Sequence, residues 1–146
     1  MKLPNSIYIT GPKENFDNLS WVHKLHENGV GGIILSLEEA SFYENHPEEH
    51  FLAYFHEKGE QMKMICEALE IVLLVSDNIQ VAHFSNADGI HFSTGNDDLP
   101  SIKKENPSLV VGMEITDLDQ VNAHDADLID FFMLSDKKPH AADVAD

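Results

Sequence analysis

The sequence contains no arginine, and its 9 basic residues are all lysines. Without a guanidinium group the chain cannot make the planar, bidentate contacts with which arginine usually holds phosphate. Acidic residues outnumber basic ones by 26 to 9, which gives a formal net charge of −17. A surface of this sign repels nucleic acid and anionic membranes. We therefore expect neither nucleic acid nor a membrane among the partners of this chain.

Cysteine and long apolar runs are scarce as well. Cys66 is the single cysteine, so an internal disulfide is impossible, and this fits a cytoplasmic location. We expect Cys66 to be a small buried residue of a helix. No run approaches the ~18 apolar residues of a membrane helix, and the start MKLPNSIYIT lacks the apolar stretch of a signal peptide. With 146 residues, 42% of them hydrophobic, we expect one domain over residues 1–146 with a real core.

What the sequence does have is an alternation of short apolar strands and amphipathic helices. This alternation predicts an α/β fold with a parallel sheet and right-handed crossovers. In such sheets ligands bind beyond the carboxyl ends of the strands. Gly29 is placed to end the first helix, and the polar tail 135–146 is expected to be frayed. The expected strands are 6–10, 32–36, 71–75, 89–92, 109–113 and 128–134, and the expected helices are 18–28, 48–58, 60–69, 79–85, one from the cap at Asp98 to Pro107, and 116–124.

Several short motifs in the second half follow one another in a recognisable order. Residues 87–92 read ADGIHF, residues 98–100 read DLP, and VG and DL stand at 111–112 and 117–118. Together with IYIT at the first strand and ADLI at 126–129, this pattern resembles thiamine phosphate synthases and their TenI-like relatives. The resemblance covers roughly Ser6 to Leu134. It implies a TIM-barrel-type fold, of which this chain holds about six of the eight βα units.

The resemblance also implies a chemistry and a set of site residues. Enzymes of that family join a pyrimidine diphosphate to a thiazole phosphate and release diphosphate with the help of magnesium. Asp77 and Asp98 take the positions of the magnesium-binding aspartates, and carboxylates are suitable hard ligands for Mg²⁺. The substrate-binding positions fall on Ser36, Ser76, His91, Thr94, Glu114 and Thr116.

The same residues also have plain structural interpretations. Asp98 can cap a helix, Asp77 can open a turn with Asn78, and His91 can be a satisfied core residue. Nothing in the residues themselves decides between these interpretations and a ligand site, so both stay open.

Several positions depart from the family's pattern, and the departures at Ser36, Glu38 and Glu114 turn a cationic pocket neutral or acidic. The family's Gln-Leu-Arg-x-Lys corresponds to residues 34–38, ILSLE, and its Ser-x-His corresponds to residues 114–116, EIT. One charge-stabilising group of this kind is commonly worth about 10²–10³ in rate. Two hypotheses follow. The chain is a magnesium-dependent transferase of thiamine synthesis that takes small phosphorylated heterocycles, or it is a degenerate member that binds a small ligand or a protein partner.

Residues 46–50, HPEEH, fit the H-x-x-E-H pattern of some zinc peptidases. Zinc binding by this pattern needs both histidines on one face of a helix. Pro47 is favoured at the first helical position, which places His46 at the cap rather than in the helix. We therefore expect a solvated helix start here and no zinc site.

Six parallel strands leave the first and the sixth strand with open edges. The sixth strand is apolar, which makes a bare edge an aggregation hazard. Self-association through the edges, a covering segment, or a truncated gene product would each account for this. We expect a homo-oligomer.

Overall fold

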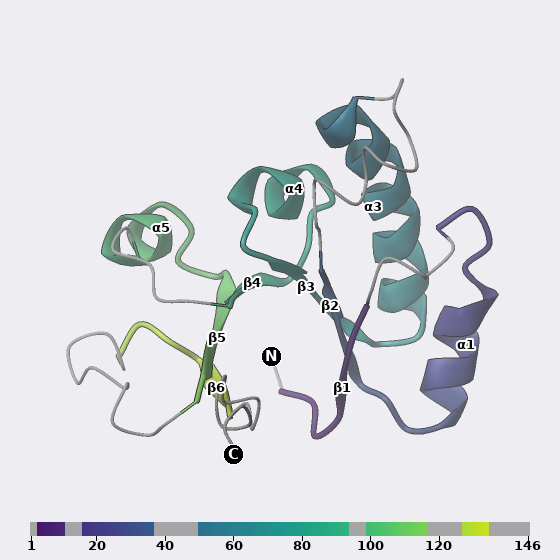
Figure 1. Cartoon of the computed structure of the whole chain (residues 1–146), viewed down its shortest axis with the longest axis horizontal. Helices are drawn as coiled ribbons and strands as arrows, with labels where there is room; N and C mark the ends of the chain where they lie inside the picture. Colours follow the sequence, from purple (N-terminus) through teal and green to yellow (C-terminus); the bar gives the residue numbers. More distant parts are fainter. Residues whose placement is uncertain (1–2, 11–15, 37–49, 94–98, 117–126, 135–146) are drawn as a thin grey trace, which may run out of the picture. The chain divides into compact units, whose positions relative to one another are not determined.

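The computed structural model describes residues 3–10, 16–36, 50–93, 99–116 and 127–134. The strands follow one another in the sheet in sequence order, and β1–β2, β2–β3 and β5–β6 pair in parallel (Figure 1). The predicted parallel α/β architecture is thereby confirmed. The elements are β1 Ile7–Ile9, α1 Ser20–Glu27, β2 Gly32–Leu35, α3 Phe51–Ala68, β3 Val72–Ser76, α4 Ile79–Phe84, β4 Gly89–Phe92, α5 Leu99–Glu105, β5 Val110–Ile115 and β6 Phe131–Leu134.

The chain forms two compact units, residues 1–90 and residues 91–146. The prediction of a single domain over residues 1–146 stays a prediction. The expected helix 116–124 and the tail 135–146 fall largely or wholly outside the described residues.

The core of the first unit lies between its strands and the helices α1, α3 and α4 (Figure 1). Ile33 and Leu73 are register partners, and both pack against Val22 of α1 and Met62 of α3. Leu74 alternates with Leu73 along β3 and is also fully buried. Strands that are buried on both faces read as continuous apolar runs, which explains the IVLLV sequence at β3. Burial of each such side chain contributes about 1.5–3 kcal/mol.

Helix α3 is a single helix of 18 residues, where the sequence analysis predicted two helices, 48–58 and 60–69. That prediction was wrong because Gly59 was taken as a boundary. A side chain added at Gly59 would bring its Cβ within 2.5 Å of the Cβ of Ser85, so glycine lets α3 approach the end of α4 closely. The helix begins after His50, whose Nδ1 accepts the Ala53 N–H at 3.4 Å. The close contact with Ser85 offsets the cost of about 1 kcal/mol that glycine imposes inside a helix.

Helices α1, α3 and α4 end in the same way. The residue after each C-cap adopts a left-handed backbone conformation, with φ of 86° at Gly29, 58° at Glu70 and 55° at Asn86. The N–H of the next residue then returns to the carbonyl five residues earlier, which is the Schellman arrangement. The prediction that Gly29 ends the first helix is confirmed. The three bonds are Val30 N–H to Leu25 O at 3.0 Å, Ile71 N–H to Cys66 O at 2.7 Å and Ala87 N–H to Ala82 O at 3.0 Å.

The second unit pairs β5 with β6. Gly112 lies opposite Phe131, and Glu114 lies opposite Met133. The Phe131 ring occupies the space that a side chain at Gly112 would need. Because alternate residues of a strand share a face, these four residues lie on the same face of the β5–β6 pair. Strand β6 begins at Phe131 rather than at 128, so its predicted start was wrong.

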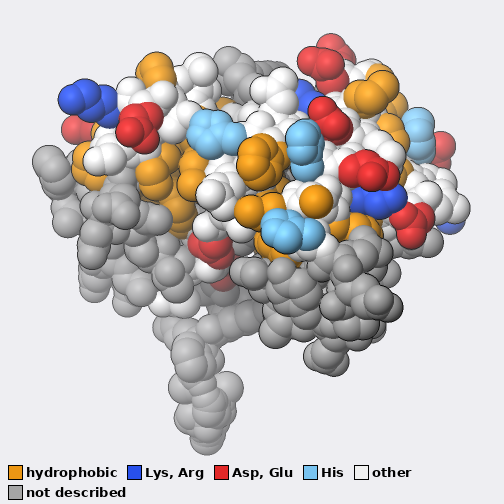
Figure 2. Space-filling model, turned by 90° about the horizontal axis from the view of Figure 1, so that it is seen from above, with side chains coloured by type: hydrophobic (Ala, Val, Ile, Leu, Met, Phe, Trp, Pro, Cys, Tyr) orange, Lys and Arg blue, Asp and Glu red, His pale blue; other side chains and the backbone are white. Residues whose placement is uncertain are grey.

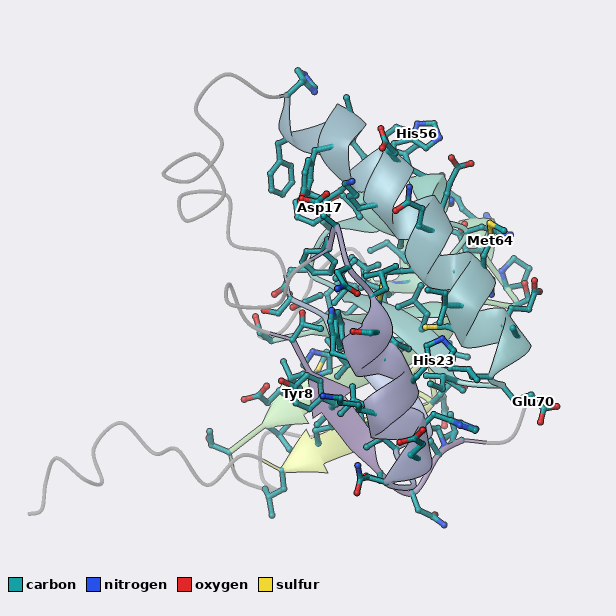
Figure 3. All side chains as sticks on the ribbon, turned by 90° about the vertical axis from the view of Figure 1, so that its right-hand side faces the viewer. Tyr8, Asp17, His23, His56, Met64 and Glu70 are labelled. Atoms are coloured by element: carbon teal, nitrogen blue, oxygen red, sulfur yellow. The ribbon has the colours of Figure 1, made fainter. Side chains whose placement is uncertain are left out.

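Three large hydrophobic side chains stand exposed among the described residues of the first unit, Ile9 of β1 at 44%, Met64 of α3 at 72% and Phe84 of α4 at 41%. The His56 imidazole stacks on the Phe84 ring, with centroids 5.3 Å apart. Figure 2, seen from the top of Figure 1, shows histidines gathered beside hydrophobic side chains, and Figure 3 labels His56 and Met64 on α3. No helix among the described residues is long and apolar enough to span a membrane.

Candidate functional site

The carboxyl ends of β1 and β2 are tied together by Thr10. The Thr10 side chain is buried, its N–H donates to the Ile34 carbonyl at 3.0 Å, and its Oγ1 accepts the Ser36 N–H at 2.9 Å. These bonds fix the backbone of Ser36 directly after β2. The structure therefore places Ser36 at the carboxyl end of its strand, where the sequence analysis put it, and its role in substrate binding stays a prediction.

The carboxyl end of β3 carries Ser76 and Asp77. The Ser76 hydroxyl donates to Asp77 Oδ2 at 3.1 Å, and Asp77 has a left-handed φ of 60°. Asn78 Oδ1 then accepts the Val81 N–H at 3.0 Å and caps α4. Asp77 and Asn78 thus form the turn from β3 into α4, as their structural interpretation predicted.

Asp77 also fits part of a magnesium site. It is exposed at the strand end, and Mg²⁺ commonly takes one or two carboxylates while water and substrate phosphates complete its octahedron. The second predicted ligand, Asp98, lies outside the described residues, as does Thr94. The residues that the structure does describe form no group of three or more His, Cys, Asp or Glu that could hold a metal ion. The pairing of Asp77 with Asp98 therefore stays a prediction.

The suspected zinc pattern at 46–50 is described only at His50. His50 has an extended backbone and caps α3 with its side chain. It therefore stands before α3 rather than on the face of that helix. The rest of the pattern lies outside the described residues.

In the second unit, His91 of β4 lies beside Glu114 of β5. His91 is buried, the Glu114 side chain is 31% exposed, and His91 Nε2 lies 3.9 Å from Glu114 Oε1. This distance suits an ion pair when the imidazole is protonated and is too long for a direct hydrogen bond. Thr116 follows β5 directly and is partly buried. The structure thus brings together two of the predicted site residues, a carboxylate and an imidazole, on neighbouring strands.

Two aspartates that the sequence analysis did not single out as site residues make matching contacts at the opposite ends of the strands. Asp88 precedes β4, and its N–H donates to the Leu73 carbonyl. Its carboxylate accepts the Leu73 N–H and a hydrogen bond from Lys63 Nζ, the latter at 3.0 Å. Asp130 precedes β6, and its N–H donates to the Val111 carbonyl. Its carboxylate accepts the Val111 N–H and a hydrogen bond from Lys103 Nζ, the latter at 3.2 Å. We call each arrangement an aspartate clamp. Both lie at amino ends of strands, which in this type of fold serve stability rather than ligand binding.

The clamps show where one sequence match was misplaced. In the structure Asp130 takes the position before β6 that Asp88 takes before β4. The sequence analysis instead placed the opening of the sixth strand at residues 126–129. The available signal was an acidic residue directly before an apolar run, with a lysine on the helix before the previous strand. Asp88 and Asp130 share that signal, and their lysines precede them by 25 and 27 residues.

Cys66 is buried in α3, as expected. Burial raises the pKa of its thiol to about 12, and the nearby Asp88 carboxylate adds to the shift while Lys63 opposes it. The thiol therefore stays protonated at neutral pH, which argues against a nucleophilic role. Near the middle of α3, a hydrogen bond to Asp17 raises the pKa of Lys58. Lys58 Nζ lies 2.7 Å from Oδ1 of Asp17, which Figure 3 labels.

Comparison with known proteins places this chain in context. The family model described as thiamine monophosphate synthase matches residues 7–140. Thiamine-phosphate synthase of Methanococcus maripaludis strain C5 is 25% identical over 126 residues, which cover 85% of this chain and 55% of the relative. The enzyme of that name from Oceanobacillus iheyensis is 27% identical over 75 residues, 51% of this chain and 36% of the relative. The chain thus spans about half, or less, of the length of the curated relatives it matches.

A solved structure shares the fold. Thiamine phosphate pyrophosphorylase from Pyrococcus furiosus superposes with a TM-score of 0.66 at 18% identity, over 87% of this chain and 58% of that one. At this identity the likeness concerns the fold. It confirms the predicted α/β fold of TIM-barrel-type βα repeats, present here in part.

Proposed function

This chain belongs to the thiamine monophosphate synthase family. From that premise we propose that it acts in thiamine synthesis. In this proposal it binds the pyrimidine and thiazole substrates but couples them far more slowly than its relatives do. The observation that carries this proposal is the Glu114 carboxylate at the end of β5, 3.9 Å from the His91 imidazole. A negative charge at this position opposes the charge that builds on a departing diphosphate.

The whole sequence points in the same direction. It contains no arginine and carries a formal net charge of −17. The positions that the resemblance assigns to substrate binding hold serine, threonine, histidine and glutamate. Two unit charges of like sign about 4 Å apart repel by about 4 kcal/mol at an effective dielectric of 20, and that is enough to slow a reaction about 1000-fold.

In this proposal Asp77 and Asp98 would hold Mg²⁺, and the ion would supply neutralising charge for a bound diphosphate. Asp77 would provide a carboxylate oxygen from the end of β3, kept in place by the Ser76 hydroxyl. Ser36, Thr94 and Thr116 would line the site with hydroxyl groups that donate to substrate oxygens. None of these groups replaces the lost ammonium and guanidinium charges.

The alternative is an active magnesium-dependent transferase, and the exposure of Asp77 at the strand end favours it. Such an enzyme would need cations from elsewhere. Lys137 and Lys138 lie in the chain after β6, and a second chain is another source.

We propose that two copies associate through the edges of their sheets, and light scattering that finds a stable monomer at micromolar concentration would rule this out.

The deciding experiment measures thiamine phosphate formation. Purified protein is incubated with the pyrimidine diphosphate, the thiazole phosphate and Mg²⁺, and the Pyrococcus furiosus protein serves as the positive control. We expect a rate at least about 1000-fold below the control. Product formation at the rate of the control, abolished by Asp77→Ala, would establish the active enzyme instead.

A further inference from the structure

The outward side of α3 carries a large apolar side chain among acidic ones. Because successive residues of an α-helix are rotated by about 100°, His56, Glu60, Met64 and Glu67 fall within an arc of about 80°. All of them are exposed, whereas the buried residues of α3 lie on the other side of the helix. Met64 is 72% exposed, more than any other large hydrophobic residue that the structure describes. We call these four residues the outer face of α3, and Figure 3 labels His56 and Met64 on it.

Phe84 extends this surface onto α4. The His56 imidazole stacks on the Phe84 ring, with centroids 5.3 Å apart and an angle of 21° between the planes. The close approach of α3 to the end of α4 at Gly59 keeps the ring beside the outer face. Met64 lies two helical turns from His56, which is about 12 Å along α3. The surface thus holds two exposed apolar side chains, one on each helix.

The charge of this surface is negative. Glu60 and Glu67 are exposed on it. The lysines of α3 do not offset them, because Lys58 Nζ and Lys63 Nζ lie 2.7 Å and 3.0 Å from aspartates outside the helix. Glu60 Oε2 lies 3.8 Å from His56 Nε2, and both side chains are more than half exposed. A surface pair of this kind is weak, so the carboxylate stays available to a positively charged partner.

Apolar contacts beside carboxylates suit a partner that is both apolar and basic. Lysine and arginine pair with carboxylates, and arginine also stacks on aromatic rings such as that of Phe84. A second copy of this chain is a poor partner for the surface, because the chain has no arginine and a formal net charge of −17. The same charge repels nucleic acid and anionic membranes. Charge complementarity therefore selects a basic segment of another protein.

We propose that the outer face of α3, together with Phe84, docks a basic amphipathic helix of another protein. Apolar side chains of that helix contact Met64 and Phe84, and its lysine or arginine side chains pair with Glu60 and Glu67. Anchors about 12 Å apart match positions seven or eight residues apart on a helix, which is how amphipathic helices bind apolar surfaces. No residue of this surface belongs to the candidate site, so the inference stands apart from the proposed function.

A synthetic amphipathic helix serves as the probe. It has 14 residues, with leucines on one face and lysines on the other, and a second peptide has glutamates in place of the lysines. By isothermal titration we expect the wild-type chain to bind the leucine–lysine peptide at least about tenfold more tightly than the leucine–glutamate peptide. Met64→Gln should weaken binding at least about fivefold, because an apolar anchor is lost. Met64→Leu keeps the anchor and should bind within about twofold of wild type.

A pair of double variants separates this surface from the general negative charge. Glu60→Gln combined with Glu67→Gln should weaken binding of the leucine–lysine peptide at least about threefold. The matched control is Glu27→Gln combined with Glu105→Gln, which removes the same charge from the exposed ends of α1 and α5. That control should bind nearly as tightly as wild type. Circular dichroism confirms that each variant is folded.

Nuclear magnetic resonance locates the peptide on the surface. The ε-methyl signal of Met64, assigned by its loss in Met64→Leu, should shift when the leucine–lysine peptide is added. An unchanged signal, equal binding by Met64→Gln and Met64→Leu, or equal weakening in the two double variants would each overturn the inference. Equal binding of the two peptides would overturn it as well, since the surface would then not select basic partners.

Discussion

Individual side chains decide how the strands of this protein are held in register, and the two aspartate clamps are the clearest case. Each carboxylate accepts a backbone N–H of the preceding strand and a bond from a lysine of the helix that comes before that strand. The clamps differ in burial, because the Asp88 side chain is 19% exposed and that of Asp130 is 41% exposed. Hydrogen bonds to charged groups gain in value as water is excluded.

Replacing Asp88 with alanine should therefore cost more than the same change at Asp130. In Asp88→Ala the Leu73 N–H and the Lys63 ammonium lose their partner, and we expect the free energy of unfolding to fall by about 2–4 kcal/mol. In Asp130→Ala we expect a loss of about 1–2 kcal/mol, since water can replace more of the bonds. Urea denaturation of the two variants measures both values, and equal losses would show that burial does not set the strength of the clamp.

The Cys66 thiol predicts a stability change at alkaline pH. Its pKa is raised to about 12 in the folded chain from an ordinary value of 9.0. The folded state therefore keeps a proton that the unfolded state loses above pH 9, so this contribution is fully present below pH 9 and is lost as the pH rises toward 12. Between pH 8 and 10.5 we expect a loss of about 2 kcal/mol from this group.

Urea denaturation of wild type and of Cys66→Ala at the two pH values isolates this effect. Lysines and tyrosines titrate in both proteins, so the difference between their pH dependences reports the thiol. An identical decline in stability for both proteins would mean that burial of Cys66 has no energetic link to pH.

At the scale of secondary structure elements, the helix ends carry a testable strain. Three helices end with a left-handed residue, and only the first of these is glycine. A non-glycine residue in this conformation costs roughly 1 kcal/mol. The chain accepts this cost at Glu70 and Asn86 because the Schellman bonds satisfy the last carbonyls of α3 and α4.

The variant Glu70→Gly should raise the free energy of unfolding by about 0.5–1 kcal/mol. Glu70 is exposed after the end of α3, so few contacts are lost (Figure 3). The reciprocal change Gly29→Ala should lower stability by a similar amount, and no atom lies within 4 Å of the added Cβ, so its effect is one of backbone conformation. Thermal or urea denaturation compares the two, and a stabilising Gly29→Ala would contradict the argument.

The elements also show what local pattern can and cannot predict. Most strands and helices lie within two or three residues of their predicted bounds, because apolar runs and caps are local signals. The division of α3 at Gly59 was wrong because the reason for that glycine is the contact with Ser85 of another helix. The start of β6 was misplaced because Leu128 and Ile129, which come before the strand, are also apolar and extend its run.

Part of the candidate site was predictable, because a general rule states where ligand sites lie on a parallel sheet. Ser36, Ser76 and Asp77 were placed by a rule of topology, since ligand sites lie at the carboxyl ends of parallel strands. The contact between His91 and Glu114 joins two strands, and the sequence alone gave no distance between them.

At the scale of the whole molecule, charge should govern stability. A formal net charge of −17 on 146 residues implies repulsion within the folded chain. Raising the ionic strength from 0.01 M to 0.15 M shortens the screening distance from about 30 Å to about 8 Å. We therefore expect added sodium chloride to raise the urea midpoint, by an amount that corresponds to about 1 kcal/mol or more.

A charge-swapped variant provides the control for this prediction. Glu67→Lys combined with Glu105→Lys changes two exposed positions and reduces the net negative charge. Its stability should respond less to salt than that of wild type. A salt response of the same size in both proteins would point to ion-specific effects in place of screening.

The aspartate clamps have one further consequence for the molecule. Since a side chain fixes how far each strand slides along its neighbour, the length of the segment that joins the two strands is left unconstrained. The connecting segments can then tolerate insertions without any slip of the sheet. A scaffold of this design can acquire new recognition loops at the carboxyl ends of its strands, while the clamps keep the spacing of the strands unchanged at their amino ends.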